Sequence, residues 1–401
     1  MSDTPSVSAG SPRRKSSLPL ILVVGLVGIG IAGVVYWNVQ SRSPAGSIPA
    51  EVAEKLTGLG LAPLANKLDA AFVDANGDLV ADAPVDPSAW VDPAEILFSY
   101  IGDKAGDWAL FMGQVSAAVG RPVRYVDYRA DEGTTAEDAF EQQLWDLRHG
   151  KLHVLGLTTG QVPMAVNVAG FVPVGKVANE KGESSYQIAF AVSAAGPIQS
   201  LTSLKEGRGY EMLMILPSSN SGYKAPLILL RDQGILPGKH YSWWWARSNE
   251  GAVRILSEAE TARSKTSIAP FSSDTLDRFL DKDPGLKEKI RVIARLGSYP
   301  RATIGLTHQL KPELAEKLTT AIRSVDLKAA GMAARLGADA AKFAPVDYAK
   351  DFAAVIEIDN ATQTRHVLVD PKSRPVEEPA GDGEPPVSEP AAVAEPAADQ
   401  G

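Results

Sequence analysis

Apolar and polar positions along residues 95–365 follow two alternating periods. Short apolar runs rich in Val, Ile and aromatic residues are typical of strands, and they occur at 96–101, 123–128, 152–157, 171–178, 187–194, 210–215, 290–296 and 302–308. Stretches with the helical period of apolar residues lie between or after them, at 108–119, 136–149, 223–233, 273–280, 312–324 and 347–364. This alternation predicts an α/β fold with mostly parallel sheets, in which ligands bind beyond the carboxyl ends of the strands.

The longest apolar run lies near the N-terminus. Leu18–Trp37 contains twenty residues without a charge and follows Arg13, Arg14 and Lys15. This length and flanking charge predict one transmembrane helix at 18–37, with residues 1–17 in the cytoplasm and the remainder outside it. A cleaved signal peptide is the alternative, and it also exports the body of the protein.

Two segments that flank the body have a composition unlike a packed domain. Residues 38–93 are rich in Ala, Asp and Pro and are predicted to form a stalk with a short helix at 50–61. Residues 366–401 are rich in Pro, Glu, Ala and Gly, so we expect a disordered tail.

The predicted stalk contains a run of oxygen-bearing side chains. Asp74, Asn76, Asp78 and Asp82 occupy positions 1, 3, 5 and 9 of a loop that resembles a calcium-binding EF loop. Leu79 replaces the glycine expected at position 6, and no glutamate stands at position 12. A structural calcium and a plain acidic turn are the two interpretations.

Composition excludes several functional classes. The net charge of −8 argues against a nucleic-acid partner, because the phosphate backbone requires a basic surface. The absence of cysteine excludes disulfides, thiolate metal sites and a cysteine nucleophile. No nucleophile–base motif is evident, so the sequence indicates a binding protein rather than an enzyme.

Polar side chains gather directly after the apolar run at 210–215. The segment Pro217–Pro226 reads PSSNSGYKAP and leads into the helical stretch LILLRDQG. Free N–H groups and the dipole at a helix N-terminus favour an anion, and serine hydroxyls can donate further hydrogen bonds. We therefore predict that Ser219, Asn220, Ser221 and Gly222 bind a ligand, with helix capping as a compatible alternative.

This segment resembles the Ser-Thr-Ser-Gly segment of the phosphate-, phosphite- and phosphonate-binding proteins of ABC importers (PhnD-like). The resemblance extends over about residues 95–345 and includes Ile96–Asp103, Leu147–Val154, Ser200–Gly207 and Ser248–Val253. It implies a type II periplasmic binding protein with two lobes and a hinge. Lobe 1 would comprise 94–195 and 300–365, and lobe 2 would comprise 196–299. Such a protein delivers its ligand to a membrane permease and performs no chemistry.

The resemblance also implies positions for further ligand-binding residues. Asp274 falls where the family has a carboxylate, whereas Ser248, preceded by Arg247, replaces its histidine. Near the family's Pro-Gly-Asp-Pro segment, this chain has Pro300-Arg301-Ala302-Thr303. Arg247 and Arg301 are therefore candidates for binding a small oxyanion. Solvated arginines, and Asp274 in the first turn of a helix, are the structural alternatives.

Thr158 and Thr159 follow the strand-like run 152–157, so they would lie at the cleft or in a plain turn. Trp243, Trp244 and Trp245 are consecutive, and some of them are expected to pack in the core or between the lobes. The predicted function is thus a membrane-anchored, extracytoplasmic solute-binding protein for phosphate, phosphite or phosphonate that supplies an ABC permease. A sensory or scaffold ectodomain with a diverged pocket is the alternative.

Overall fold

The computed structural model describes residues 64–100, 103–129, 134–207, 209–237, 239–258 and 261–371. All of them belong to the second of two compact units, Ser47–Gly401. The predicted segments at 1–17, 18–37 and 50–61, and the tail beyond residue 371, lie outside these ranges. Within them, no helix combines the length and the apolar character needed to cross a membrane.

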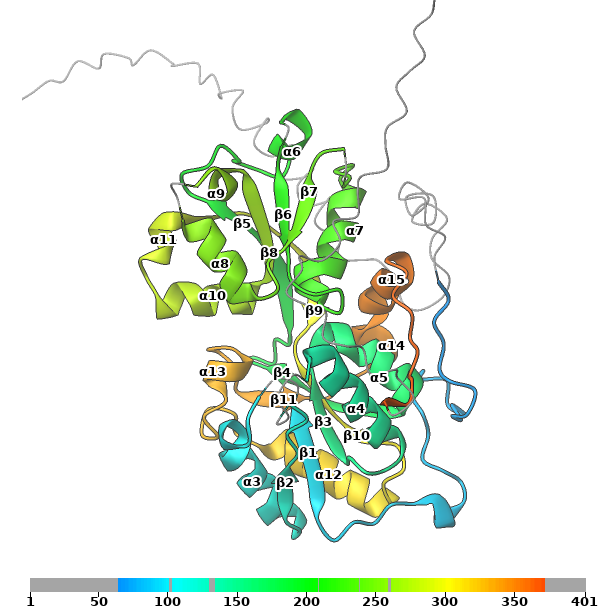
Figure 1. Ribbon diagram of the computed structural model, residues 1–401. Helices are drawn as coiled ribbons and strands as arrows, with labels where there is room; N and C mark the ends of the chain where they lie inside the picture. The colour runs from blue at the N-terminus through cyan, green and yellow to red at the C-terminus, as the bar shows by residue number, and fades with distance from the viewer. Residues whose placement is uncertain are drawn as a thin grey trace, which may run out of the picture. The chain divides into compact units, whose positions relative to one another are not determined.

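The first lobe is built on a mixed sheet with the strand order β11-β4-β10-β3-β1-β2 (Figure 1). Its strands are β1 (Ile96–Tyr100), β2 (Val123–Tyr125), β3 (Val154–Leu157), β4 (Phe171–Ala178), β10 (Thr303–Thr307) and β11 (Lys342–Ala344). Side chains alternate across β1: Ile96 and Phe98 enter one hydrophobic cluster, and Leu97 packs against another. Strand β3 is buried throughout, which explains its continuous apolar sequence.

Helices cover both faces of this sheet. The cluster around Phe98 includes residues of η2 (Ala105–Trp108), α3 (Ala109–Val119) and α12 (Pro312–Ser324). The cluster on the other face includes residues of α4 (Ala136–Arg148) and α5 (Val162–Ala169). A capping box formed by Thr135 and Asp138 starts α4, and Gly120, at φ 76°, ends α3.

The second lobe is built on a sheet with the strand order β7-β6-β8-β5-β9. Its strands are β5 (Ser185–Ser193), β6 (Glu211–Met214), β7 (Ser242–Trp245), β8 (Ser267–Ser272) and β9 (Ile290–Pro300). Its helices are α6 (Ser203–Glu206), η4 (Asn220–Lys224), α7 (Ala225–Asp232), α8 (Asn249–Ser257), α9 (Ala262–Thr266), α10 (Ser273–Lys282) and α11 (Leu286–Lys289). In Figure 1, α7 lies on one side of the sheet and α8, α10 and α11 on the other.

Two strand connections carry the chain between the lobes. Strand β4 leads into β5, and β9 leads back into β10. Strands β5 and β9 pair with each other from Ser185↔Pro300 to Ser193↔Ile290, and the N–H of Arg301 donates to the carbonyl of Ser184. The two connections therefore lie side by side, as a two-strand hinge requires.

The ends of the body pack against the lobes. The C-terminal part contains α13 (Ala333–Leu336), α14 (Tyr348–Asp351) and α15 (Ala353–Ala361), and short 3-10 turns occur at η1 (Pro87–Ala89) and η3 (Thr159–Gln161). Residues 64–93, predicted as part of a stalk, run along lobe 1. There the N–H of Asp69 donates to the carbonyl of Asn167 (2.8 Å), Asp69 pairs with Arg148 (2.8 Å) and Val80 is buried.

The structure confirms all the predicted strand-like runs as strands, with ends that differ by a few residues. The prediction of mostly parallel sheets is wrong. Parallel pairing is confined to β1–β2, β1–β3, β6–β7 and β6–β8 among the described strands, and every other pair is antiparallel. Every antiparallel pair involves β4, β5, β9 or β10, the strands that carry the chain from one lobe to the other and back. The single helix predicted at 347–364 is split into α14 and α15 at Phe352.

Candidate functional site

The segment predicted to bind a ligand connects the buried strand β6 to the start of α7. Ser219 is the N-cap of η4, and its Oγ accepts a hydrogen bond from the N–H of Gly222 (3.0 Å). A Cβ on Gly222 would lie 2.3 Å from Cγ1 of Ile215, so glycine lets the helix begin directly against the end of the strand. The capping interpretation is therefore correct for Ser219, and it leaves the hydroxyl hydrogen free to be donated. We call Ser218–Gly222 the cradle.

Several hydrogen-bonding groups of the cradle remain available for a ligand. The N–H groups of Asn220 and Ser221 make no backbone hydrogen bond within the described ranges, as is usual in the first turn of a helix. Asn220 is 3% exposed and donates from Nδ2 to the Tyr186 hydroxyl (2.9 Å), but its Oδ1 has no partner in the described part of the chain. Burial raises the pKa of Tyr186 to about 12, so this phenol stays neutral.

The first lobe presents η3 to the cradle. Thr158 is exposed and donates from Oγ1 to Oε1 of Gln161 (2.8 Å), whereas Thr159 is buried and donates to the carbonyl of Pro300 (2.6 Å). A Cβ on Gly160 would lie 2.5 Å from the carbonyl oxygen of Ser218 and 2.7 Å from the N of Asn220. The two lobes thus meet backbone to backbone beside the cradle.

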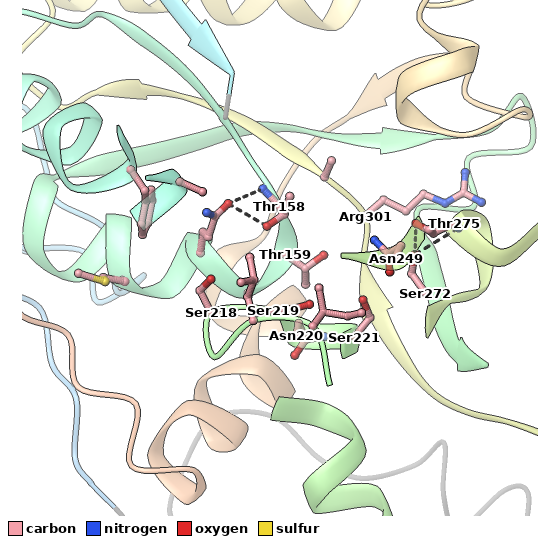
Figure 2. Close-up of a pocket in the computed structure, with 18 of the residues that line it drawn as sticks. Thr158, Thr159, Ser218, Ser219, Asn220, Ser221, Asn249, Ser272, Thr275 and Arg301 are labelled. Atoms are coloured by element: carbon pink, nitrogen blue, oxygen red, sulfur yellow. Dashed lines mark hydrogen bonds between the residues drawn. The ribbon is translucent and has the colours of Figure 1, made fainter. Parts of the chain in front are cut away.

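These elements line one cavity of about 620 Å³ (Figure 2). Its wall brings together most of the predicted ligand-binding residues: Thr158, Thr159, Ser219, Asn220, Ser221, Asp274 and Arg301. Figure 2 shows the threonines of lobe 1 and the serines of the cradle on facing elements. Apolar and aromatic groups complete the wall, among them Tyr100, Phe140, Met164 and Tyr186. Mostly uncharged donors and apolar surface are typical of a small-molecule site.

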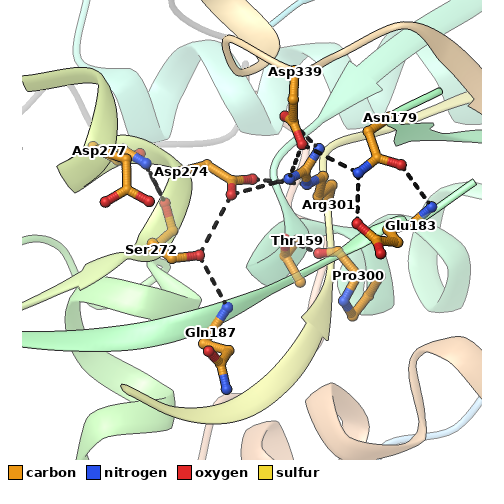
Figure 3. A network of polar contacts seen from close by, with 12 residues as sticks. Thr159, Asn179, Glu183, Gln187, Ser272, Asp274, Asp277, Pro300, Arg301 and Asp339 are labelled. Carbon is orange, nitrogen blue, oxygen red and sulfur yellow. Dashed lines mark hydrogen bonds and ion pairs between the residues drawn. The ribbon is translucent and has the colours of Figure 1, made fainter. Parts of the chain in front are cut away.

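Arg301 lies at the cavity with its charge already matched (Figure 3). It is 8% exposed, and its nitrogens lie 2.9 Å from a carboxylate oxygen of Asp274 and 2.9 Å from one of Asp339. Burial raises the pKa of Asp274 despite the neighbouring guanidinium. Burial would also raise the pKa of Asp339, but the hydrogen bond and charge of Arg301 lower it overall. Asp274 belongs to lobe 2, so this cluster links the lobes.

Three predicted residues, Gly222, Arg247 and Ser248, do not line the cavity. Ser248 is the N-cap of α8, and its Oγ accepts from the N–H of Gly251 (3.0 Å). Arg247 is exposed and has a positive φ of 63°. The neighbouring Asn249 reaches the cavity wall instead.

The three tryptophans of β7 are not core residues. Trp243, Trp244 and Trp245 are 44%, 45% and 36% exposed, so the expectation that some of them pack in the core is wrong. Strand β7 is an edge strand bonded only to β6 in the described sheet, and none of its four residues is buried. The ring of Trp244 lies under the guanidinium of Arg263 (4.1 Å), and that of Trp245 lies 5.4 Å from Tyr223.

Sequence reasoning missed a buried charge behind the cradle. Lys224 is fully buried; its Nζ donates to the carbonyl of Gly160 (2.8 Å) and pairs with Asp359 of α15. The lysine therefore ties the start of the cradle helix to lobe 1 and to the C-terminal helix. The sequence signal that could have indicated this buried charge is a lysine directly before an otherwise apolar helical stretch.

The loop predicted to bind calcium uses its oxygens differently. The carboxylate of Asp74 accepts from the N–H groups of Gly77, Asp78 and Leu79, and that of Asp82 accepts from the N–H of Ala75. Asn76 bonds to Asp78 through its side chain. Within the described ranges, no group of three or more His, Asp or Glu side chains is arranged to hold a metal. The calcium remains a prediction that this geometry does not support.

Comparisons with known proteins identify the family. Residues 107–352 match the family model for the periplasmic substrate-binding protein of phosphonate ABC transporters. Similar solved structures include a binding protein of a phosphonate ABC transporter from Pseudomonas aeruginosa (16% identity, TM-score 0.51, covering 68% of this chain and 87% of that one). PhnD1 from Prochlorococcus marinus in complex with methylphosphonate is also similar (14% identity, TM-score 0.51, covering 67% and 98%). A third is a Xanthomonas citri protein bound to ATP (17% identity, TM-score 0.50, covering 68% and 98%).

No curated protein matches the chain. The structural likenesses establish the two-lobed type II binding fold, and the family match extends over more than half of the sequence. Members of this family bind a solute and catalyse no reaction. The chain belongs to the periplasmic substrate-binding proteins of phosphonate ABC transporters.

Proposed function

We propose that this protein binds the oxyanion group of a phosphonate or phosphate in the cradle and presents it to an ABC permease. One observation carries the proposal: the cradle of lobe 2 and Thr158–Gly160 of lobe 1 line the same cavity. In a binding protein that closes around its ligand, the donors of both lobes would then reach one anionic group.

The donors suit an oxyanion. The N–H groups of Asn220 and Ser221 and the hydroxyls of Ser219 and Ser221 can converge on phosphonate oxygens, and the start of the helix adds a favourable dipole. Hydrogen bonds to an ionised acceptor are roughly twice as strong as neutral ones. Arg301 would support this site by linking the lobes through its ion pairs with Asp274 and Asp339, and not by binding the oxyanion as an unpaired cation.

Calorimetry on the purified full-length chain tests the proposal. Methylphosphonate is the first ligand to try, because the similar Prochlorococcus protein was solved with it, followed by phosphate and phosphite. The double variant Ser219→Ala/Ser221→Ala should weaken binding by about 10- to 100-fold, as expected when two hydrogen bonds to a charged group are lost. Ser248→Ala, a serine outside the cavity, is the matched control. Absence of heat with every oxyanion would refute the proposal.

We also propose that the apolar run 18–37 anchors the protein in the cytoplasmic membrane, with the body in the periplasm or outside the cell. The family match, which is to periplasmic proteins, supports an exported body. Extraction of membranes with alkaline carbonate tests the anchor: an anchored chain stays in the pellet, and a cleaved one is released. Copurification of a permease would support transport over sensing.

A further inference from the structure

The chain beyond α15 returns to the ligand cavity. We call Thr364–Val367 the strap. Asn66 holds it by two contacts: its Nδ2 donates to the carbonyl of Thr364 (2.8 Å), and its Oδ1 accepts from the N–H of His366 (3.1 Å). The Asn66 amide is itself positioned by α15, because its Nδ2 also donates to the Asn360 side chain (3.0 Å). The backbone of the strap is thereby fixed on both sides of Arg365.

His366 anchors the strap in the interior. Its side chain is 1% exposed, with Nε2 2.9 Å from the Asp359 carboxylate and Nδ1 2.7 Å from Nδ2 of Asn167. The Asn167 amide donates to Nδ1, so Nε2 carries the hydrogen that Asp359 accepts. Asp359 also pairs with Lys224 behind the cradle. The same buried carboxylate therefore positions both the strap and the cradle helix.

Arg365 of the strap lies at the cavity. His366 is directed inward, and its neighbours Arg365 and Val367 both line the cavity. Arg365 is exposed, and it makes no ion pair with any acidic residue in the described part of the chain. By contrast, Arg301 pairs with Asp274 and Asp339.

The strap is an addition to the part of the chain that matches the family. The family model ends at residue 352, before α15 begins. The cavity of about 620 Å³ has room for a ligand longer than methylphosphonate. Glu137 of α4 also lines it, and its carboxylate would repel a second anionic group on the ligand unless a cation offset it.

We propose that Arg365 is a specificity-determining residue that favours phosphonates carrying a second anionic group, such as a carboxylate. The inference rests on the proposed function, because the cradle must hold the phosphonate end. The planar guanidinium of Arg365 can form two parallel hydrogen bonds to a carboxylate. Its positive charge would disfavour a ligand with an ammonium group at the same position.

Calorimetry with methylphosphonate, 3-phosphonopropionate and 2-aminoethylphosphonate tests this assignment on the full-length chain. We expect Arg365→Gln to weaken 3-phosphonopropionate binding by about tenfold or more and to change methylphosphonate binding by less than about twofold. Binding of 2-aminoethylphosphonate should be unchanged or tighter. Arg365→Lys should retain part of the preference, since it keeps the charge but loses the planar fork.

Arg247→Gln is the matched control, because it removes the same charge from an exposed arginine outside the cavity. Thermal unfolding of each variant distinguishes a change in specificity from a change in stability. Equal effects of Arg365→Gln on all three ligands, or no effect on any, would overturn the role of Arg365 while leaving the proposed function intact. A wild-type protein that binds none of the three overturns the proposed function and this inference with it.

Discussion

Gly160 provides the sharpest test of how the two lobes form the site. A Cβ at this position would lie 2.5 Å from the carbonyl oxygen of Ser218 and 2.7 Å from the N of Asn220. Both atoms belong to the backbone of the cradle, so neither can rotate away as the end of a flexible side chain could. Gly160→Ala must therefore either displace the cradle or hold the lobes apart.

The expected magnitude follows from this clash. Overpacking a close contact costs about 1–3 kcal/mol. Because the cost falls on the closed arrangement of the lobes, we expect it to appear as weaker ligand binding, by about 5- to 150-fold. Separation of the lobes in the absence of ligand would relieve the clash but break the bond from Lys224 Nζ to the Gly160 carbonyl, so we expect the thermal stability of the unliganded protein to fall as well. Calorimetric titration with methylphosphonate measures the first quantity, and differential scanning calorimetry measures the second.

Gly113→Ala is the matched control for this substitution. Gly113 lies in α3, and a Cβ added there would have no atom within 4 Å. The control should bind ligand as the wild type does and gain up to about 1 kcal/mol of stability from the helix propensity of alanine. If Gly160→Ala bound ligand as tightly as the wild type, the inference that the lobes must meet at Gly160 around the ligand would be refuted.

Three further predictions concern stability. Lys224→Met should lower the free energy of unfolding by about 3–5 kcal/mol in urea titrations, because it removes the cation from the buried Asp359 carboxylate and leaves only the hydrogen bond from His366. A loss below about 1 kcal/mol would contradict a buried ion pair. Gly222→Ala should cost about 1–3 kcal/mol and weaken ligand binding, since its Cβ would meet Ile215 at 2.3 Å, and unchanged binding would contradict this packing. Burial lowers the pKa of His308 from 6.5 to about 4, so the unfolded chain takes up a proton in this window that the folded chain does not. The free energy of unfolding should therefore fall as pH decreases through the window, and an equal fall in His308→Gln would exclude His308 as its source.

Local sequence was sufficient to predict the strands and the cradle. Strand β3 and the start of α7 are specified by residues within a few positions of each other, and Ser219 caps its helix from three residues away. Such features depend on short-range periodicity and capping, which a single sequence records. Ser248 was placed in the site because the family resemblance aligned it with a ligand-binding histidine, whereas its local sequence is that of an N-cap, which is the role it has in the structure.

The sequence alone did not predict which distant charged residues pair with each other. Arg301 meets Asp274 and Asp339 only because the hinge brings both lobes to the end of β9, and Lys224 meets Asp359 across 135 positions. The exposure of the β7 tryptophans likewise depends on where the fold places this strand, at the edge of its sheet. Charge partners and strand order are properties of the assembled fold, and they cannot be predicted from apolar periodicity.

The distribution of charge around the cavity indicates how an oxyanion would be recognised. Arg301 is bound between two carboxylates, and Arg335 pairs with Asp103 (2.5 Å) and Asp107. Turning the buried Arg301 to a ligand would leave Asp274 and Asp339 uncompensated, which costs more than the new contact would supply. The pairs of Arg335 are weaker, because its side chain is 37% exposed. We therefore expect recognition at the cradle to rest mainly on hydroxyl and N–H donors fixed by the fold. Such donors attract anions only over short distances, so the affinity of this protein depends on how closely the two lobes approach each other around the oxyanion. The strap would add the charge of Arg365 in the part of the cavity that remains for the rest of the ligand.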